Sequence, residues 1–377
     1  MEFSSNEEQK LLADALGRFV AKEYGFEKRR AIVGQPEGFS RDIWRALADM
    51  GMLGLPFAEE HGGIGGGPIE TMLVMNAFGS GLVVEPYFAT VIMGGGLINL
   101  CASDSQKQAL LPGIAQGRLL LAFAHGEPHS RYDLASVATR AQRAGAGWTV
   151  TGHKSVVLHG AQADKLLVSA RTSGTNPGPQ GISLFLVERG AKGVRVRDYR
   201  TIDGLRAAEI HLDGASAELL GTEGGAYEAI ERAVDAGTAA LCAEAVGAME
   251  ALNAHTLDYI KGRQQFGQPI GRFQVNQHKA VDMMVHFEQS KSMAYFAAMR
   301  VGSGEPRVRR HAVSGAKAHI GKSARFIAEN AIQLHGGMGM TDELAASHYA
   351  KRLVMIDVQL GDAHHHIERF IENADRG

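Results

Sequence analysis

The spacing of apolar residues changes twice along the 377 residues, from helical to strand-like and back to helical. This order of segments restricts the fold more than any other feature. Over residues 1–118, apolar side chains recur every three or four positions, which predicts helices, and Ser5 with Glu8 predicts a capping box for the first of them. Over residues 119–223, short alternating runs between Gly and Pro clusters predict strands. Helical spacing returns from residue 224. Segregated helices and strands exclude a βαβ nucleotide-binding fold, which needs alternating elements.

We therefore predict three domains: an N-terminal all-α domain (1–118), a middle β-barrel or β-sandwich domain (119–223) and a C-terminal four-helix bundle (224–377). The length requires more than one hydrophobic core. One apolar stripe supports the bundle above all, and small residues on it allow close helix packing. Its members are Val313, Ala316, Ile320, Ala324, Ile327, Ala331 and Leu334.

Composition excludes several classes of protein. Apolar residues make up 45% and charged residues 21%, and the formal net charge of −2 favours no binding to nucleic acid. Because no basic segment precedes an apolar run and no apolar stretch reaches about 18 residues, we expect neither a signal peptide nor a membrane span. Cys101 and Cys242 lie far apart in apolar surroundings, which indicates buried thiols in a reducing, cytoplasmic compartment.

Residues 259–274 carry a dense group of chemically distinctive side chains, Tyr-Ile-Lys-Gly-Arg-Gln-Gln-Phe-Gly-Gln-Pro-Ile-Gly-Arg-Phe-Gln. A helix is expected to end near Gly267, because Pro269 prevents its continuation. Arg263 and Phe266 allow two interpretations. They are either a cation at a helix C-terminus and a packing residue, or a pyrophosphate clamp and a stacking plate for a flat ring. Side-chain chemistry alone leaves both open.

This stretch resembles a signature of the acyl-CoA dehydrogenase family. Residues 333–341, Gln-Leu-His-Gly-Gly-Met-Gly-Met-Thr, are similar to the family's Gln-x-x-Gly-Gly-x-Gly segment. The spacing of about 70 residues between the two motifs and the domain order also match, over essentially the whole chain. The resemblance implies FAD-dependent α,β-dehydrogenation of an acyl-CoA thioester, with an electron-transfer flavoprotein as the electron acceptor.

The resemblance also implies where FAD binds, at an interface between subunits. The protein is therefore expected to be a homo-oligomer (dimer or tetramer) or a heteromer with a large acyl-CoA dehydrogenase subunit. Bare glycine backbone suits close approach to phosphate. The implied contacts are Arg263, Gln265, Phe266 and Gln274 from one protomer, and Gln333, Gly336 and Gly337 beside the adenosine diphosphate part of a flavin held mainly by the neighbour.

In the middle domain, the resemblance implies further contacts with the flavin ring. Phe123, His125 and Gly126 align with a family strand that ends in Thr-Glu-Pro. Residues 131–133, Arg-Tyr-Asp, stand where members have Gly-Ser-Asp, and Tyr132 is a candidate substrate contact. Residues 156–158, Val-Val-Leu, replace a Trp-x-Thr that faces the flavin, so an aromatic shield and a hydroxyl are missing.

The reaction needs a carboxylate beside the α-carbon to accept a proton. The family's usual glutamate position corresponds to Gly361, and a carboxylate follows at Asp362. Asp362 is therefore a candidate catalytic base that has shifted by one residue, or an N-cap for the final helix. A minority of members place the glutamate on an earlier helix, near Gly237 or Thr238, where this chain again has no carboxylate.

Asp235 and Glu244 flank that earlier position, and we take Asp235 and Thr238 as candidate substrate contacts. Three consecutive histidines, residues 364–366, invite a metal-site interpretation. Neighbouring helical residues diverge by about 100°, so three adjacent side chains do not converge on one ion, and we predict no metal. His365 is expected near the flavin, where the family has a polar side chain.

Several passages resemble one branch of the family, the small subunit of bacterial pimeloyl-CoA dehydrogenase. In that branch a large and a small subunit work together. Two functions follow: dehydrogenation of a dicarboxylic or medium-chain acyl-CoA by this chain, or a catalytically incomplete partner subunit that contributes to the flavin site but not the base. A third alternative keeps the fold but oxidises with oxygen or acts without net oxidation. The passages are residues 57–72, 130–134, 156–160 and 240–249.

Overall fold

The computed structural model describes residues 6–145 and 147–374, and its contacts form two compact units. The helical unit comprises Met1–Ala31, Pro68–Val83 and Thr238–Gly377, and the β unit comprises Ile32–Gly67 and Val84–Gly237. The predicted boundaries of three domains stay a prediction, because this division follows contacts and not the order of the chain.

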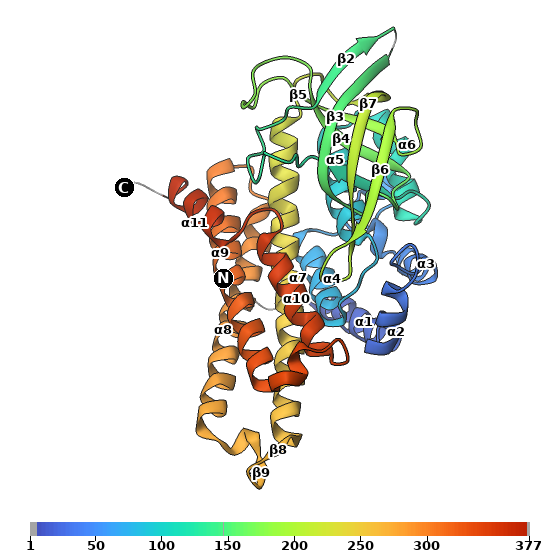
Figure 1. Ribbon diagram of the computed structural model, residues 1–377. Coiled ribbons are helices and arrows are strands. Elements are labelled where there is room, and N and C mark those ends of the chain that lie inside the picture. The colour runs from blue at the N-terminus through green and yellow to red at the C-terminus, as the bar shows by residue number, and fades with distance from the viewer. Residues whose placement is uncertain (1–5, 146, 375–377) are drawn as a thin grey trace. The chain divides into compact units, whose positions relative to one another are not determined.

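The helical unit is built around long helices (Figure 1). One helix, α7, begins in the β unit and continues into this unit. Similarly, most of α2 belongs to the helical unit, and its last two residues, Ile32 and Val33, belong to the β unit. The elements are α1 (Glu7–Glu23), α2 (Phe26–Val33), α4 (Pro68–Gly81), α7 (Tyr227–Gly262), β8 (Gln264–Gln265), β9 (Gln268–Pro269), η4 (Ile270–Arg272), α8 (Gln274–Val301), α9 (Pro306–His335), η5 (Gly336–Met340), α10 (Ala345–Val358) and α11 (Ala363–Glu372).

The first helix is capped one residue later than predicted. Ser5 lies outside the described residues, and the N-cap of α1 is Asn6, whose side chain accepts a hydrogen bond from the backbone of Gln9. The Gln9 side chain accepts one in return from the Asn6 backbone at 3.0 Å. The capping box is therefore formed by Asn6 and Gln9 and not by the predicted Ser5 and Glu8, because Asn and Gln can make the same reciprocal pair of hydrogen bonds one residue later.

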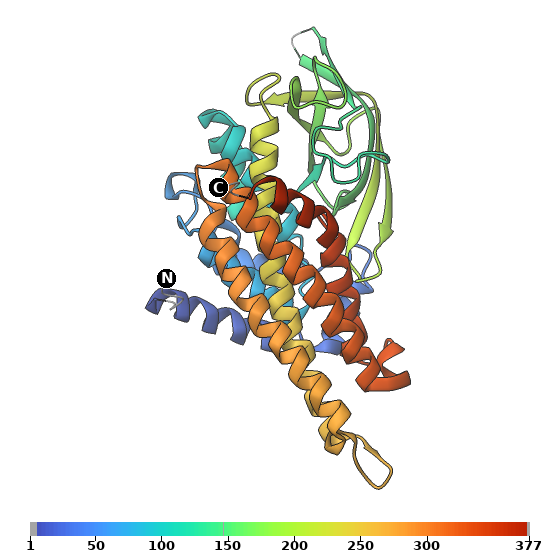
Figure 2. The same cartoon turned by 90° about the vertical axis from the view of Figure 1, so that its left-hand side faces the viewer.

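Helix α9 lies at the centre of the bundle and confirms the predicted stripe. All seven stripe residues are at most 5% exposed. The helix packs against α8, α10 and α11, and Figure 2 shows α8 and α9 running side by side. Pro306 stands in its first turn, where a missing backbone N–H costs nothing. The stripe forms a helix because its small residues bury a continuous apolar face.

Helices α4 and α7 cross at backbone contact. A Cβ added at Gly79 would lie 1.9 Å from the Glu244 carbonyl oxygen, and one at Gly247 would lie 1.9 Å from the Asn76 carbonyl oxygen. Only glycine permits such an approach. Each helix therefore presents a glycine to the backbone of the other.

The β unit combines short helices with one sheet. Its helical elements include a π-helix, η3. The elements are α3 (Arg41–Asp49), η1 (Met52–Gly54), η2 (Glu59–His61), η3 (Phe88–Gly95), α5 (Gly96–Cys101), α6 (Asp104–Ala115), β1 (Leu121–Ala124), β2 (Arg140–Ala144), β3 (Gly147–Leu158), β4 (Lys165–Arg171), β5 (Ile182–Glu188), β6 (Val194–Arg200) and β7 (Arg206–Leu220).

The strands pair in the order β1-β4-β2-β3-β7-β5, with β6 on β7. A further pairing between β4 and β5 closes the ring into a small barrel. Inward side chains such as Trp148 and Phe185, whose rings lie 5.3 Å apart, fill it. The predicted fold, helices on either side of a middle β domain in the chain order, is confirmed.

Candidate functional site

A hairpin of β8 and β9 joins α7 to α8 (Figure 1). Phe266 and Gly267 lie between its two paired strands. Phe266 and Gly267 both have positive φ, 54° and 78°, as the two-residue turn of a tight hairpin requires. The Phe266 side chain is 90% exposed, and its ring meets that of Phe273 edge-on at 6.1 Å. A non-glycine residue in the left-handed region with an exposed aromatic ring favours a binding role over a packing role.

The fold brings the two signature motifs together at one end of the helical unit. The Tyr259 ring, one turn before Arg263, stacks on the His335 ring with centroids 4.4 Å apart. Burial lowers the pKa of His335 below its usual range, so the ring is neutral at physiological pH. The stack therefore links the last turns of α7, which lead into residues 263–266, with the end of α9, which leads into residues 336–337.

Glycines expose bare backbone just after α9. Gly336, the C-cap of α9, has φ 59°, and a Cβ at Gly336 or Gly337 would meet nothing within 4 Å. Such backbone is open to a phosphate group. The residues therefore fit the adenosine diphosphate part of FAD. The predicted contacts Arg263, Gln265, Gln274 and Gln333 are likewise exposed.

The β unit places the other predicted flavin contacts at the end of β1. The His125 ring stacks on Phe123 at 5.3 Å, and its Nδ1 lies 2.9 Å from Ser169 Oγ. Burial, reinforced by the charge of Lys154, lowers the pKa of His125 to about 3, so the ring is neutral. The Gly126 carbonyl accepts the backbone N–H of Ser155 at 2.8 Å and ties this end of β1 to β3.

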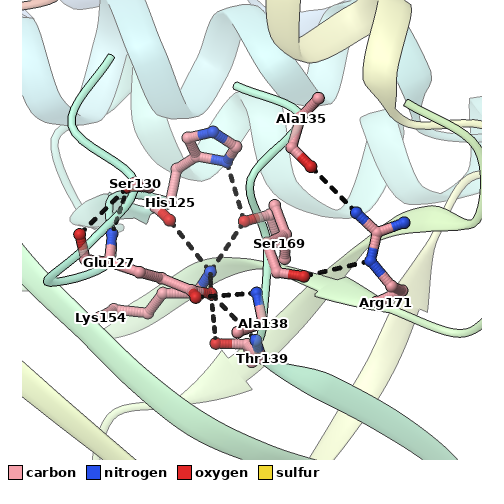
Figure 3. Close-up of polar contacts among 10 residues, drawn as sticks. His125, Glu127, Ser130, Ala135, Ala138, Thr139, Lys154, Ser169 and Arg171 are labelled. Atoms are coloured by element: carbon pink, nitrogen blue, oxygen red, sulfur yellow. Dashed lines mark hydrogen bonds and ion pairs between the residues drawn. The ribbon is translucent and has the colours of Figure 1, made fainter. Parts of the chain in front are cut away.

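A buried ion pair, missed from the sequence, organises the loop after β1 (Figure 3). The Lys154 side chain is fully buried, and its Nζ lies 2.7 Å from Glu127 Oε1. Nζ also donates to the His125 carbonyl at 3.0 Å and to Ser169 Oγ at 3.1 Å. Burial lowers the pKa of Lys154 to about 8, against the attraction of Glu127.

Glu127 binds the far end of the same loop. Its carboxylate accepts backbone N–H groups of Ala138 at 2.8 Å and Thr139 at 3.0 Å, and the Thr139 hydroxyl at 2.7 Å. Burial raises the pKa of Glu127, but Lys154 and these donors lower it more, so the carboxyl is ionised. The ion pair therefore closes residues 127–139 into a fixed loop, and the half-buried Tyr132 lies within it.

Arg171 holds the same loop from β4. Its guanidinium donates to four backbone carbonyls, and burial lowers its pKa. Each of these carbonyls comes from a loop and not from a strand. The Arg171 side chain therefore supplies hydrogen bonds that a neighbouring strand would otherwise provide. The acceptors are Val137 at 3.1 Å, Ala135 at 3.0 Å, Gly178 at 2.9 Å and Gln180 at 2.7 Å.

The predicted flavin-facing segment of β3 is a β-bulge. Val156 has φ 52° and a 56% exposed side chain, whereas the next residue, Val157, is buried in the barrel core. Leu158 is half-buried. Of these three replacements, Val156 is the one that projects most toward solvent.

The turn between α10 and α11 accepts only glycine at position 361. Gly361 has φ 114°, and a Cβ there would lie 2.5 Å from His365 Cδ2 and 2.6 Å from His366 Nε2. Leu360 also has a positive φ, 57°. The correspondence of Gly361 to the family's glutamate position stays a prediction, but the backbone at 361 has no room for a glutamate side chain without movement of both histidines.

Asp362 is the N-cap of α11. Its Oδ1 accepts the backbone N–H groups of His364 at 3.1 Å and His365 at 2.9 Å. These hydrogen bonds, that of His365 first, hold the pKa of Asp362 below its usual range. A carboxylate that is stabilised in its charged form is a weak proton acceptor. The geometry favours the capping interpretation over the catalytic one.

Lys317 of α9 fixes this turn from inside the bundle. Its buried Nζ donates to the Asp357 carbonyl at 2.7 Å and to the Gly361 carbonyl at 2.5 Å. His366 Nε2 lies 3.0 Å from the Leu360 carbonyl oxygen. The turn that contains two positive φ angles is therefore held through two of its own carbonyls and through one carbonyl in the last turn of α10, as such strained backbone requires.

Burial lowers the pKa of Lys317 to about 8, so its titration should be visible in stability. Between pH 8 and about 10.4 the unfolded chain binds more protons than the folded chain, and the free energy of unfolding therefore rises with pH. We expect the wild type to gain about 1–2 kcal/mol relative to Lys317→Met between pH 8 and 10. Urea denaturation at several pH values measures this difference, and equal pH slopes would contradict it.

Glu244 of α7 is engaged in a buried ion pair. Its two carboxylate oxygens accept from Arg352 Nε at 2.6 Å and Arg352 Nη2 at 2.8 Å. The side chains are 7% and 6% exposed. Asp235 and Thr238, the candidate substrate contacts, are fully buried on the same helix. His365 is half-buried beside Gly361, and burial lowers its pKa.

Comparison with known proteins identifies the family. Family profiles match residues 6–118 as "Acyl-CoA dehydrogenase, N-terminal domain", 122–215 as "Acyl-CoA dehydrogenase, middle domain" and 223–368 as "Acyl-CoA dehydrogenase, C-terminal domain". The chain belongs to the acyl-CoA dehydrogenase family. Among acyl-CoA dehydrogenases it is 28% identical to the probable acyl-CoA dehydrogenase YngJ of Bacillus subtilis, over 98% of both chains. It is 27% identical to the short-chain specific acyl-CoA dehydrogenase of Clostridium acetobutylicum, over 91% of each.

Solved structures agree with this assignment. A structure from a study of the electron transferring flavoprotein of Acidaminococcus fermentans has a TM-score of 0.91 at 26% identity and covers both chains fully. One chain of the ChsE4–ChsE5 complex of Mycobacterium tuberculosis has a TM-score of 0.89 at 25% identity, over 99% of this chain and 98% of that one. An FAD-dependent dehydrogenase has a TM-score of 0.88 at 27% identity, over 99% of each.

These relationships bear on the other predictions. At the level of the family, an oxidoreductase that acts on CH–CH bonds with FAD is confirmed. Among the described residues no helix is long and apolar enough to cross a membrane, and no group of three metal-ligating side chains converges. The assignment to the pimeloyl-CoA dehydrogenase small subunit stays a prediction.

Proposed function

We propose that this chain is an FAD-binding subunit of an acyl-CoA dehydrogenase and that a partner subunit supplies the carboxylate that accepts the α-proton. One observation carries the proposal: Asp362 and Glu244, which stand near the two predicted base positions, are already engaged, and Asp235, the other carboxylate near the earlier position, is fully buried. Asp362 caps a helix and Glu244 pairs with Arg352, while position 361 accepts only glycine. Each would have to give up existing interactions to act as a base.

The outward-facing flavin residues support a site that two chains complete. Phe266, Gly336 and Gly337 present an aromatic ring and bare backbone to solvent. The ChsE4–ChsE5 structure is a complex of two proteins, and its similarity over nearly the whole chain supports a heteromer here. A homodimer or homotetramer is the alternative assembly, and the oligomeric state distinguishes them.

The remaining parts of the proposal concern substrate and acceptor. The resemblance to the pimeloyl-CoA dehydrogenase small subunit favours a dicarboxylic acyl-CoA, with a medium-chain acyl group as the alternative. The similarity to a structure from work on an electron transferring flavoprotein supports such a protein as the electron acceptor. The two cysteines, of which Cys242 is buried, fit a cytoplasmic location.

In this mechanism the chain's own residues bind and orient. Bound FAD supplies the oxidising centre that takes a hydride from the β-carbon. Arg263 carries the positive charge that complements a pyrophosphate, and Phe266 offers a face for stacking. The Lys154–Glu127 pair holds the loop that carries Tyr132 in one conformation. The proton from the α-carbon passes to the partner's carboxylate.

Co-expression with a large acyl-CoA dehydrogenase subunit tests the proposal. The purified chain alone is expected to show no anaerobic bleaching of a flavin spectrum with acyl-CoA, whereas the heteromer is expected to bleach. A heteromer should also elute as one larger species on sizing. Full-rate bleaching by the chain alone would contradict the need for a partner.

Asp362→Asn separates the two interpretations of Asp362. Asparagine keeps an oxygen for the cap, so we expect wild-type stability and an unchanged bleaching rate in the heteromer. Asp362→Ala, the control, should lose about 1 kcal/mol of stability with the cap. A bleaching rate reduced by more than about tenfold in Asp362→Asn would identify Asp362 as the base instead.

A further inference from the structure

Strands β3 and β7 lose register at two points, and one of them lies between Lys154 and Val157. Lys154 pairs with Ile210 and Val157 with Ala208, so Ser155 and Val156 both stand opposite Glu209. This arrangement is a β-bulge, a feature that re-aims side chains and is common beside active sites. Val156 has φ 52° there. A β-branched residue in the left-handed region is an outlier and persists only when its surroundings hold it.

The Glu209 carboxylate holds the bulge from the outer face of the sheet. Its Oε1 accepts the Val156 backbone N–H at 3.3 Å and the Tyr199 hydroxyl at 3.1 Å. Its Oε2 lies 2.7 Å from His153 Nε2. These groups come from β3 and β6, so one side chain of β7 joins three strands at the bulge.

The charge of Glu209 is stabilised where it lies. Burial raises its pKa, but hydrogen bonds from Ser155, His153, Val156 and Tyr199 lower it more, and the net pKa is below the usual range. Glutamate is an uncommon residue inside a strand, and Glu209 is the fourth of the 15 residues of β7. The four hydrogen-bond donors stabilise its charged carboxylate at this position.

The inner side of the same bulge is tied to the predicted flavin contacts. The Ser155 N–H donates to the Gly126 carbonyl at 2.8 Å, and Lys154, the residue before, binds the His125 carbonyl. A shift of the bulge would therefore move residues 125–126. Glu209 itself lies on the opposite side of the strand from these residues, since its partner His153 points away from the barrel core that Lys154 enters.

We propose that Glu209 is a positioning residue that holds the Ser155–Val156 bulge in its strained conformation and thereby fixes the flavin-contacting segment 125–126. The proposal rests on the proposed binding of FAD by this chain. Removal of the carboxylate frees the Val156 N–H and lets the residue relax toward negative φ. Glycine at 156 would adopt the same backbone without strain.

Hydrogen exchange and flavin binding of the full-length heteromer test this role. We expect Glu209→Ala to speed amide exchange at residues 155–157 at least tenfold, to weaken FAD binding at least fivefold and to shift the flavin absorption band. Glu209→Gln, which keeps one acceptor, should show smaller effects. Addition of Val156→Gly to Glu209→Ala should recover most of the affinity and the wild-type spectrum.

Asp213→Ala, an exposed carboxylate on the same strand, is the matched control and should change neither quantity. Exchange and affinity within twofold of wild type in Glu209→Ala would overturn the proposal. So would faster exchange with unchanged flavin affinity and spectrum, or a double variant no better than the single one. If the wild type bound no flavin, the proposed function would fail, whereas exchange at residues 155–157 would still decide whether Glu209 holds the bulge.

Discussion

Replacement of Arg352 by methionine is expected to lower the free energy of unfolding by about 3–5 kcal/mol. The substitution leaves Glu244 as a buried carboxylate without its bidentate partner, and the cost of that unpaired charge dominates. Gln359, whose Oε1 accepts from Arg352 Nη1 at 3.1 Å, also loses a donor. Urea denaturation monitored by circular dichroism measures the change.

Two further variants test whether the loss comes from the unpaired charge of Glu244. Lys351→Ala removes a neighbouring cation that pairs with Asp342 on the surface, and we expect a loss below about 1 kcal/mol. Arg352→Met combined with Glu244→Leu removes both charges and should recover much of the stability. A loss of less than 1 kcal/mol in Arg352→Met alone would show that Glu244 does not depend on Arg352.

Gly361→Glu is expected to destabilise the protein by about 2–5 kcal/mol and to create no base. A side chain at φ 114° costs backbone strain, and its Cβ would overlap His365 and His366. His366 cannot move freely, because its Nδ1 also lies 3.2 Å from Ser314 Oγ on α9. Thermal unfolding measures the loss, and anaerobic bleaching by the variant alone tests for activity.

A conservative control separates the effect of the Cβ from that of the rest of the glutamate side chain. Gly361→Ala adds only the Cβ and should lose most of the same stability, because the Cβ already causes both effects. A stable Gly361→Glu variant that bleaches flavin without a partner would show that position 361 is an emptied glutamate position and that the turn rearranges readily.

Local patterns in the sequence were sufficient for much of the fold. The stripe on α9 predicts its own burial because helical period depends only on neighbouring residues. The two signature motifs and their spacing also predicted the family, and in the fold the Tyr259–His335 stack joins the motifs. These features are encoded over short stretches, so a single sequence reveals them.

The polar interior could not be predicted in the same way. Glu244 and Arg352 are 108 residues apart, and nothing near either one signals the other. Lys154 did carry a signal, because it stands on the inward side of the alternation that begins at Trp148 and Val150. A buried cation requires an acceptor, but the tertiary fold decides that Glu127 provides it. Positive φ at Val156 had no local signal at all.

The crossing of α4 and α7 has a consequence for how this protein tolerates change. Most contacts between helices are made by side chains, which can adopt other rotamers when a neighbouring residue is replaced. At Gly79 and Gly247 no side chain lies between the two backbones. Variation elsewhere in the bundle can be absorbed by repacking, whereas the spacing of these two helices is fixed by the main chain itself. Related proteins that diverge in sequence should therefore keep the crossing of α4 and α7, while residues of the surrounding core are replaced.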